Sequence, residues 1–221
     1  MLPYVLPFAL YLALTQILPE FPAEYYPWLY GTVVLIVGAV AGYFLSARRL
    51  VRAHWNILPG VGAGILGIAL WIWLSGLGAE QYLMGFLPDW LCPEVRPAYN
   101  PFESLSGPLA CWGFVAIRMI GLAVVVPVAE EVFWRGFLMR WAISSDWEKQ
   151  PIGQFTPGSF LWVVGLFTLA HPEWLAAAVY CVLLNGLLYW KRDLWNCVVA
   201  HGVSNLLLGV YVLSTGNWSL W

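Results

Sequence analysis

Charged residues are scarce in this chain: only 10% of its 221 residues are Asp, Glu, Lys or Arg, whereas 61% are hydrophobic. Soluble domains carry about 25% charged residues, so the composition argues against a water-soluble globule. The chain has no basic run and its formal net charge is −2, so no nucleic-acid partner is expected. Apolar stretches of about 20 residues recur instead, which is typical of a multi-pass helical membrane protein.

Several common catalytic patterns are also missing. The sequence has no HExxH zinc motif, no Gly-x-Ser-x-Gly elbow and no glycine-rich phosphate loop. The cysteines show no CxxC or other metal-ligand spacing, and we expect neither a disulfide nor a zinc ribbon from Cys92, Cys111, Cys181 and Cys197. No cofactor is therefore expected.

The apolar stretches predict membrane segments at residues 2–19, 28–46, 57–78, 109–129, 130–143, 159–171, 172–190 and 194–214. Two of them, 130–143 and 159–171, would be only about 20 Å long, less than the ~30 Å hydrocarbon core. Pro127 and Pro172 lie beside these short segments and are expected to break or kink the helices there. We predict an all-α polytopic bundle of about eight helices around a cavity, formed by one membrane domain over residues 1–221.

Charges in the loops predict an orientation. The 48–55 connection carries three arginines and no acid, whereas the 20–27 and 80–108 loops are acidic. By the positive-inside rule, the N-terminus is then cytoplasmic, in the plasma membrane or in the inner membrane of a bacterium.

The tryptophans agree with a membrane location. At expected helix ends, where indoles favour the headgroup region, stand Trp28, Trp55, Trp90, Trp190, Trp195 and Trp218. We expect Trp71, Trp73 and Trp162 to pack in the core instead.

Two adjacent carboxylates, Glu130 and Glu131, end an apolar stretch, with Arg135 one helical turn further on. A charge in hydrocarbon costs about 2.5–3.5 kcal/mol on insertion scales, so a doubled one needs a reason. In a helix Glu131 faces Arg135 at i+4, whereas Glu130 is turned away by about 100°. Glu130 then stays unpaired and poorly solvated, which suits a general base for water. The structural alternative is an ion-pair cluster that holds helices together.

A second pattern is Phe167-x-x-x-His171, at the end of a short apolar helix. The Phe167 ring is one turn before His171 and is expected to lie against the imidazole and limit its rotation. Pro172 follows directly, so we expect a break that leaves His171 facing a cavity. The alternative is a hydrogen-bonded core histidine.

A third pattern places His201 and Asn205 four residues apart, on one face of an apolar span. Their N–H groups, aimed at one point, could stabilise the oxyanion formed when water attacks a peptide carbonyl. Gly202 between them allows another backbone or a substrate to approach closely. The alternative is hydrogen bonding between membrane helices.

In this order, Glu130-Glu131-x-x-x-Arg135, Phe167-x-x-x-His171 and His201-x-x-x-Asn205 resemble the motifs of the CPBP intramembrane proteases. That family includes CAAX prenyl endopeptidases and bacteriocin-processing and abortive-infection proteins. The resemblance covers about 109–214 and implies a cavity open to the cytoplasm. It implies that Glu130 and His171 activate a water molecule, and that His201 and Asn205 form the oxyanion hole. Glu131, Arg135 and Phe167 would position the site, with no metal ion.

The expected function is an intramembrane endopeptidase that acts by direct water attack on a peptide or protein substrate in the lipid bilayer, prenylated in the CAAX case. One alternative is a metal-dependent protease with Glu130, His171 and His201 as ligands. Another is a non-enzymatic scaffold or immunity protein. A proton-coupled transporter would show half-helix repeats, and none is seen. The Trp-rich form also resembles CAAX-protease-related proteins of exosortase systems, which suggests an exosortase-type partner.

Overall fold

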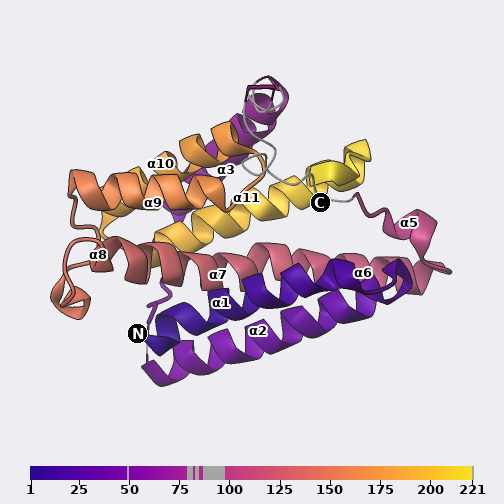
Figure 1. The fold of residues 1–221 in the computed structure, drawn as a ribbon, viewed down its shortest axis with the longest axis horizontal. Helices are drawn as coiled ribbons and strands as arrows, with labels where there is room; N and C mark the ends of the chain where they lie inside the picture. Colours follow the sequence, from indigo (N-terminus) through magenta and orange to yellow (C-terminus); the bar gives the residue numbers. More distant parts are fainter. Residues whose placement is uncertain (49, 79–81, 83–84, 87–97, 221) are drawn as a thin grey trace.

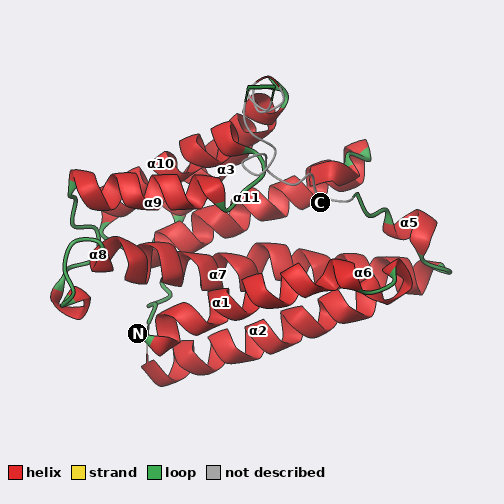
Figure 2. Ribbon diagram, viewed as in Figure 1, coloured by secondary structure: helices red, strands yellow, loops and turns green. Residues whose placement is uncertain are grey.

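The computed structural model describes residues 1–48, 50–78, 82, 85–86 and 98–220, and this part of the chain is helical, without strands. Figures 1 and 2 show two groups of helices that meet along α11. One group contains α1 (Leu2–Ile17), α2 (Tyr26–Arg48) and the long helix that runs through α6 (Pro108–Ile120), α7 (Val126–Glu131) and α8 (Met139–Trp141). The other contains α3 (Leu58–Ser75), α9 (Pro157–Leu169), α10 (Trp174–Lys191) and α11 (Leu194–Thr215). The short α5 (Pro101–Ser104) precedes α6. The predicted all-α bundle is confirmed.

Six helical stretches in the described residues are long and apolar enough to cross a membrane: Leu2–Glu20, Ala23–Ala47, Leu58–Ser75, Pro108–Trp141, Trp174–Lys191 and Leu194–Thr215. Pro157–Leu169 is a shorter apolar helix. The protein is therefore a multi-pass integral membrane protein. The expected division between 109–129 and 130–143 is wrong, because these residues form one continuous helical stretch.

Pro127 does not break this helix, because the backbone changes register just before it. The segment η4 (Gly121–Val125) is a π-helical turn, and the next N–H, that of Val126, donates to the carbonyl of Gly121. In this register the carbonyl of Leu122 would accept from residue 127, but a proline has no N–H. The Nδ2–H of Asn205 on α11 donates to this carbonyl instead, at 2.9 Å. The carbonyl of Leu122, which has no backbone donor at Pro127, thus connects the long helix to α11.

The break expected at Pro172 is confirmed. Helix α9 ends at Leu169 and α10 begins at Trp174, so His171 lies in the turn between them. A second π-helical turn, η5 (Val132–Leu138), carries Arg135 within the long helix.

Helix α3 packs against α11 through glycines. A methyl group at Gly60 would lie 2.6 Å from the carbonyl oxygen of Asn196, and one at Gly64 would lie 2.6 Å from that of Ala200. Small residues let membrane helices approach this closely. The contact holds α11, which carries His201, in a defined register against α3.

We expect Gly64→Ala to lower the stability of the bundle by about 1–3 kcal/mol, because the added methyl group collides with the backbone of α11. Gly62 is the control, because a methyl group there would meet nothing within 4 Å. Thermal unfolding in detergent should separate the two variants. Equal melting temperatures for Gly64→Ala and Gly62→Ala would contradict the packing of α3 on α11.

A polar cluster fixes the first turn of α11. The carboxylate of Asp193 accepts hydrogen bonds from the backbone N–H groups of Trp195 and Asn196, at 3.2 and 3.1 Å. The side-chain amide of Asn196 donates to it at 2.6 Å, and the Nε2–H of His54 at 3.0 Å. Partial burial acts to raise the pKa of Asp193, but these hydrogen bonds outweigh it and hold the pKa below its ordinary value of 3.8.

The depressed pKa of Asp193 predicts how stability depends on pH. The carboxylate stabilises the folded state fully above the ordinary pKa, and this contribution is lost as the pH falls through the lower folded-state pKa. We expect Asp193→Asn to be less stable than the wild type at neutral pH. The difference in melting temperature should shrink below about pH 4, where the wild-type carboxylate becomes protonated. A difference that stays constant down to the lowest pH at which the protein folds would contradict this role.

Two tryptophans are not where the sequence predicts. Trp73 and Trp162, expected in the core, are 62% and 63% exposed, because they lie on outward faces of α3 and α9. Trp71 is half-buried against the main core, as expected. Predictions that concern Arg49, Trp90, Cys92 and most of the 80–97 loop fall outside the described residues.

Candidate active site

Arg135 is the centre of a buried polar network. Its Nη1 donates to Oε1 of Glu131 at 3.1 Å, and both side chains are fully buried. Its Nε donates to the Oδ1 of Asn185 at 3.1 Å, and its Nη2 contacts the Sγ of Cys181 at 3.2 Å. The guanidinium also lies 5.0 Å from the centre of the Phe167 ring. The predicted i, i+4 pair is confirmed, and α10 and α9 complete the surroundings of the cation.

Glu131 also binds His201, which the sequence did not predict. The Nδ1 of His201 lies 2.9 Å from the same Oε1 that accepts from Arg135. A carboxylate paired with an arginine accepts only, so the Nδ1 of His201 carries the proton. This hydrogen bond joins residues 70 positions apart, from the first and third motifs. This hydrogen bond uses the Nδ1 of His201 and not its Nε2, which is the atom that could act on a substrate.

Glu130 is not paired with Arg135, as predicted. Its Oε2 accepts a hydrogen bond from the indole Nε1–H of Trp134 at 3.3 Å. The side chain is only 6% exposed, and it lies close enough to His201 to interact with it electrostatically. Glu130 is thus a buried carboxylate without a cation in direct contact among the described residues.

His171 is held against Phe167, also as predicted. The two rings stack with centroids 4.4 Å apart, and the Nδ1 of His171 lies 2.8 Å from the carbonyl oxygen of Phe167. A carbonyl only accepts, so Nδ1 carries the proton, and in the neutral ring the lone pair is on Nε2. The Phe167 ring also makes an edge contact with Trp134, at 5.6 Å between centroids. A row of rings therefore connects His171 with the residue that binds Glu130.

Asn205 lies one turn after His201 on α11, but one N–H of its amide is used by the carbonyl of Leu122. An amide has two N–H donors, so the other is not used in that bond. Gly202 lies against the backbone of the long helix beside Leu122: a methyl group at Gly202 would be 2.6 Å from the carbonyl oxygen of Ala123. The close backbone approach predicted at Gly202 is confirmed.

Direct hydrogen bonds thus join Glu131, Arg135 and His201, whereas Glu130 and His171 reach the same region through aromatic rings. Within the described part of the chain, no three His, Cys, Asp or Glu side chains are grouped so that they could hold a metal ion. The ligand set of the metal-dependent alternative is therefore not assembled here.

Some residues of this region were missed by the sequence analysis. The hydroxyl of Tyr180 donates to the Oγ of Ser204 at 2.9 Å, and the Tyr180 ring meets His201. Asn185 is not among the missed residues, because an amide within an apolar helix is costly without a partner and predicts the interhelical contact that it makes with Arg135, at 3.1 Å. Tyr180 and Ser204 carried no such signal, since both residue types are ordinary in membrane helices.

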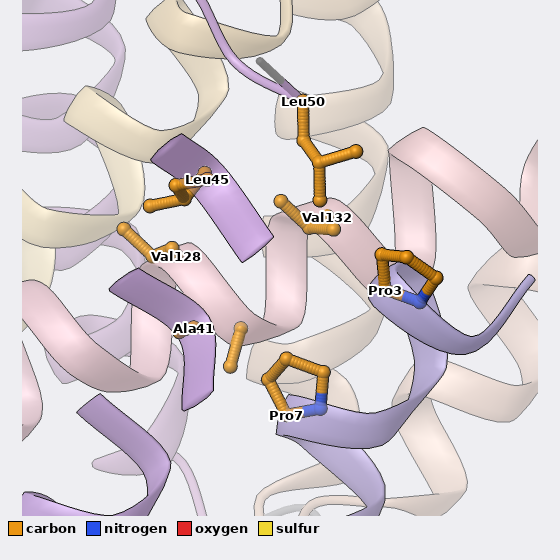
Figure 3. Close-up of a pocket in the computed structure, with 8 residues that line it drawn as sticks. Pro3, Pro7, Ala41, Leu45, Leu50, Val128 and Val132 are labelled. Atoms are coloured by element: carbon orange, nitrogen blue, oxygen red, sulfur yellow. The ribbon is translucent and has the colours of Figure 1, made fainter. Parts of the chain in front are cut away.

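A small cavity lies on the side of the glutamate-bearing helix that faces α1 and α2. Figure 3 shows its walls, Pro3 and Pro7 from α1, Ala41 and Leu45 from α2, with Leu50, Val128 and Val132. Its volume is about 10 Å³ and every lining residue is apolar, so it resembles a packing defect rather than a binding site.

A larger groove of about 480 Å³ lies between the long helix and α11. Its walls are apolar: Met119, Ile120, Ala123, Val124 and Val128 on one side, and Trp195, Val198, Val199, Gly202, Val203 and Leu206 on the other. The four predicted catalytic side chains do not line it, but its walls include the two residues that follow His201 in the chain. An apolar groove therefore borders the polar network.

Comparison with known proteins agrees with these motifs. Residues 112–207 match a family model described as type II CAAX prenyl endopeptidase Rce1-like. No curated protein and no solved structure was found to match the chain. The matched segment runs from before Glu130 to beyond Asn205, so it contains all three motifs. Over residues 112–207 the chain is therefore similar to the type II CAAX prenyl endopeptidase Rce1-like family, a family of membrane proteases.

Proposed function

We propose that this protein is an intramembrane endopeptidase that hydrolyses a peptide bond of a membrane-associated substrate by direct attack of water. The observation that carries the proposal is the 2.9 Å hydrogen bond between Glu131 and His201, which joins two motifs inside the bundle. A scaffold would need the Glu131–Arg135 pair at most. It would not need the second buried carboxylate of Glu130, which is costly in a membrane.

Glu130 and His171 are the proposed bases. The lone pair on Nε2 of neutral His171 or the carboxylate of Glu130 takes a proton from water as the water oxygen attacks the carbonyl carbon. The tetrahedral intermediate then collapses, the C–N bond breaks, and the same group returns the proton to the leaving nitrogen. No covalent bond to the protein is formed in this scheme.

His201 and Asn205 are the proposed oxyanion donors. Because the Nδ1–H of His201 is bound to Glu131, an Nε2–H donor exists beside it only in the imidazolium form. Glu131 accepts this hydrogen bond, which gives it a second task beside its pairing with Arg135. The N–H of Asn205 that does not bind Leu122 would be the second donor.

The apolar groove is the proposed site for the lipid part of a prenylated substrate. Its volume of about 480 Å³ lies within the range of about 300–1,000 Å³ that ligand pockets have. An isoprenoid chain lying along α11 would bring the neighbouring peptide bond toward His201. The cytoplasmic N-terminus and the exosortase-type partner stay predictions from the sequence.

The test is incubation of the detergent-purified protein with a farnesylated Cys-Val-Ile-Met peptide and with its unfarnesylated twin. We expect release of a fragment from the carboxyl end, with faster cleavage of the farnesylated peptide. Hydroxylamine should yield no hydroxamate, because direct water attack leaves no acyl-enzyme to trap. A folded preparation that cuts neither peptide would contradict the proposed function.

The same assay distinguishes the metal-dependent alternative. Direct water attack by Glu130 and His171 predicts that 1,10-phenanthroline leaves the rate unchanged. Loss of activity with the chelator, followed by recovery on addition of Zn²⁺, would favour a metal site and overturn the proposed mechanism.

A further inference from the structure

Helix α3 lies outside the segment that matches the family model, yet one of its side chains reaches the candidate active site. The Trp71 ring makes an edge contact with the His171 ring, with centroids 5.8 Å apart and an angle of 71° between the planes. It makes a second edge contact with Tyr180, at 5.8 Å and 85°. Trp71 therefore lies between the turn that carries His171 and helix α10.

Tyr180 continues this contact to the second histidine. Its ring meets that of His201 at 5.8 Å and 75°. Its hydroxyl donates to Ser204, whose Oγ lies 2.8 Å from the carbonyl oxygen of Gly64 on α3. The ring also packs on Gly67 so closely that a methyl group there would collide with it. Tyr180 is thus held at its ring by Gly67 of α3 and at its hydroxyl by Ser204 of α11, which itself binds α3.

We propose that Trp71 and Tyr180 are positioning residues that fix the orientation of His171 and His201 in the candidate active site. The inference rests on the proposed function, since the two histidines are its base and its oxyanion donor. The Nδ1 of each histidine is tied to one acceptor, Phe167 or Glu131. The His171 ring is also stacked on Phe167, and a tilt of either histidine ring would displace its Nε2, the atom that acts in the proposed chemistry.

The row His171–Trp71–Tyr180–His201 restrains this tilt from both ends. Edge-to-face contacts are directional, because the positive edge of one ring meets the negative face of the next. A displacement of about 1 Å at a reacting atom typically costs on the order of 100-fold in rate. Positioning of this kind should therefore appear in kcat, with little change in KM.

The first experiment compares two tryptophans of the same helix in the peptide assay. We expect Trp71→Leu to lower kcat by roughly 10- to 100-fold with little change in KM. Trp73→Leu is the control and should behave like the wild type, because Trp73 is 62% exposed on the outside of α3. Trp71→Phe keeps an aromatic edge and should recover most of the lost rate. A wild-type kcat for folded Trp71→Leu would overturn the proposal.

A second set of variants tests Tyr180, first by displacing its ring and then by changing its side chain. Gly67→Ala should push the ring away from its place and lower kcat, whereas Gly62→Ala on the outer face of α3 should not. Tyr180→Phe keeps the ring and loses only the bond to Ser204, so its kcat should fall less than that of Tyr180→Leu. If Trp71→Leu does not fold, Gly67→Ala and Trp71→Phe carry the test. Wild-type kcat in Gly67→Ala would then contradict the proposal.

Nitrogen NMR of the histidine rings gives a readout that needs no activity. The chain has only three histidines, so ¹⁵N-histidine labelling yields three ring systems. We expect Trp71→Leu to shift and broaden the signals of His171 while those of His54 stay unchanged. If even the wild type cleaves no peptide, the proposed function fails, and the NMR comparison alone decides the positioning role. Unchanged His171 signals would overturn it.

Discussion

Replacing Glu130 with Gln should lower the rate of peptide hydrolysis by about 10²–10⁴-fold while the protein remains folded. Gln has the size of Glu and can still accept the hydrogen bond from Trp134, which lies 3.3 Å from Oε2. It cannot take a proton from water. Since Glu130 has no ion pair among the described residues, the substitution removes the base without leaving a buried cation uncompensated.

The measurement is kcat for the farnesylated peptide, with the melting temperature as a check on folding. Glu148→Gln is the matched control, because it makes the same change at an exposed residue of the short 3-10 helix Trp147–Lys149 that follows α8. It should keep wild-type activity. A Glu130→Gln variant that folds and retains full activity would remove Glu130 from the mechanism and favour a scaffold role for the polar cluster.

Glu131→Gln should instead lower the free energy of unfolding by about 3–5 kcal/mol. The substitution leaves the fully buried guanidinium of Arg135 without a counter-charge in contact, although Asn185 and Cys181 remain beside it. It also removes the charge that holds His201 at 2.9 Å. The loss of stability is expected to be larger than that from any other single charge in the described network.

Thermal and SDS-induced unfolding in detergent should reveal the difference. Asp146→Asn is the control, since it removes an ion pair with Lys149 that is 2.9 Å long but exposed, and it should cost about 0–1 kcal/mol. The double variant Glu131→Gln with Arg135→Met removes both charges of the buried pair and should recover part of the loss. Equal stability of Glu131→Gln and Asp146→Asn would mean that the buried pair is not ionised.

Local spacing alone predicted much of this site. Residues four apart on a helix share a face, so the Glu131–Arg135 pair followed directly from the sequence, and the predicted Phe167–His171 stack forms although His171 lies in the turn just after α9. The same geometry placed Glu130 away from Arg135. These features depend only on the backbone of one helix turn, which is why no knowledge of the fold was needed.

The boundaries of the membrane segments were less predictable. Pro127 was expected to end or kink a helix, and it does not end one, since it lies within the continuous stretch Pro108–Trp141. A proline breaks a helix only if its missing N–H and its ring find no accommodation. Here a π-helical turn precedes it and Asn205, from a distant part of the chain, binds the orphaned carbonyl of Leu122. That partner could not be read from the residues around Pro127.

The sequence by itself determined the membrane class, the helical bundle and the pairs within single turns, because hydrophobic length and helical period act locally. Only the tertiary structure decided that Glu131 binds His201, that Asn185 contacts Arg135, and that Trp71 lies beside His171. These contacts join helices far apart in the chain. Their geometry depends on how closely the helices pack, and glycines allow that approach where α3 crosses α10 and α11 and where Gly202 of α11 meets the long helix.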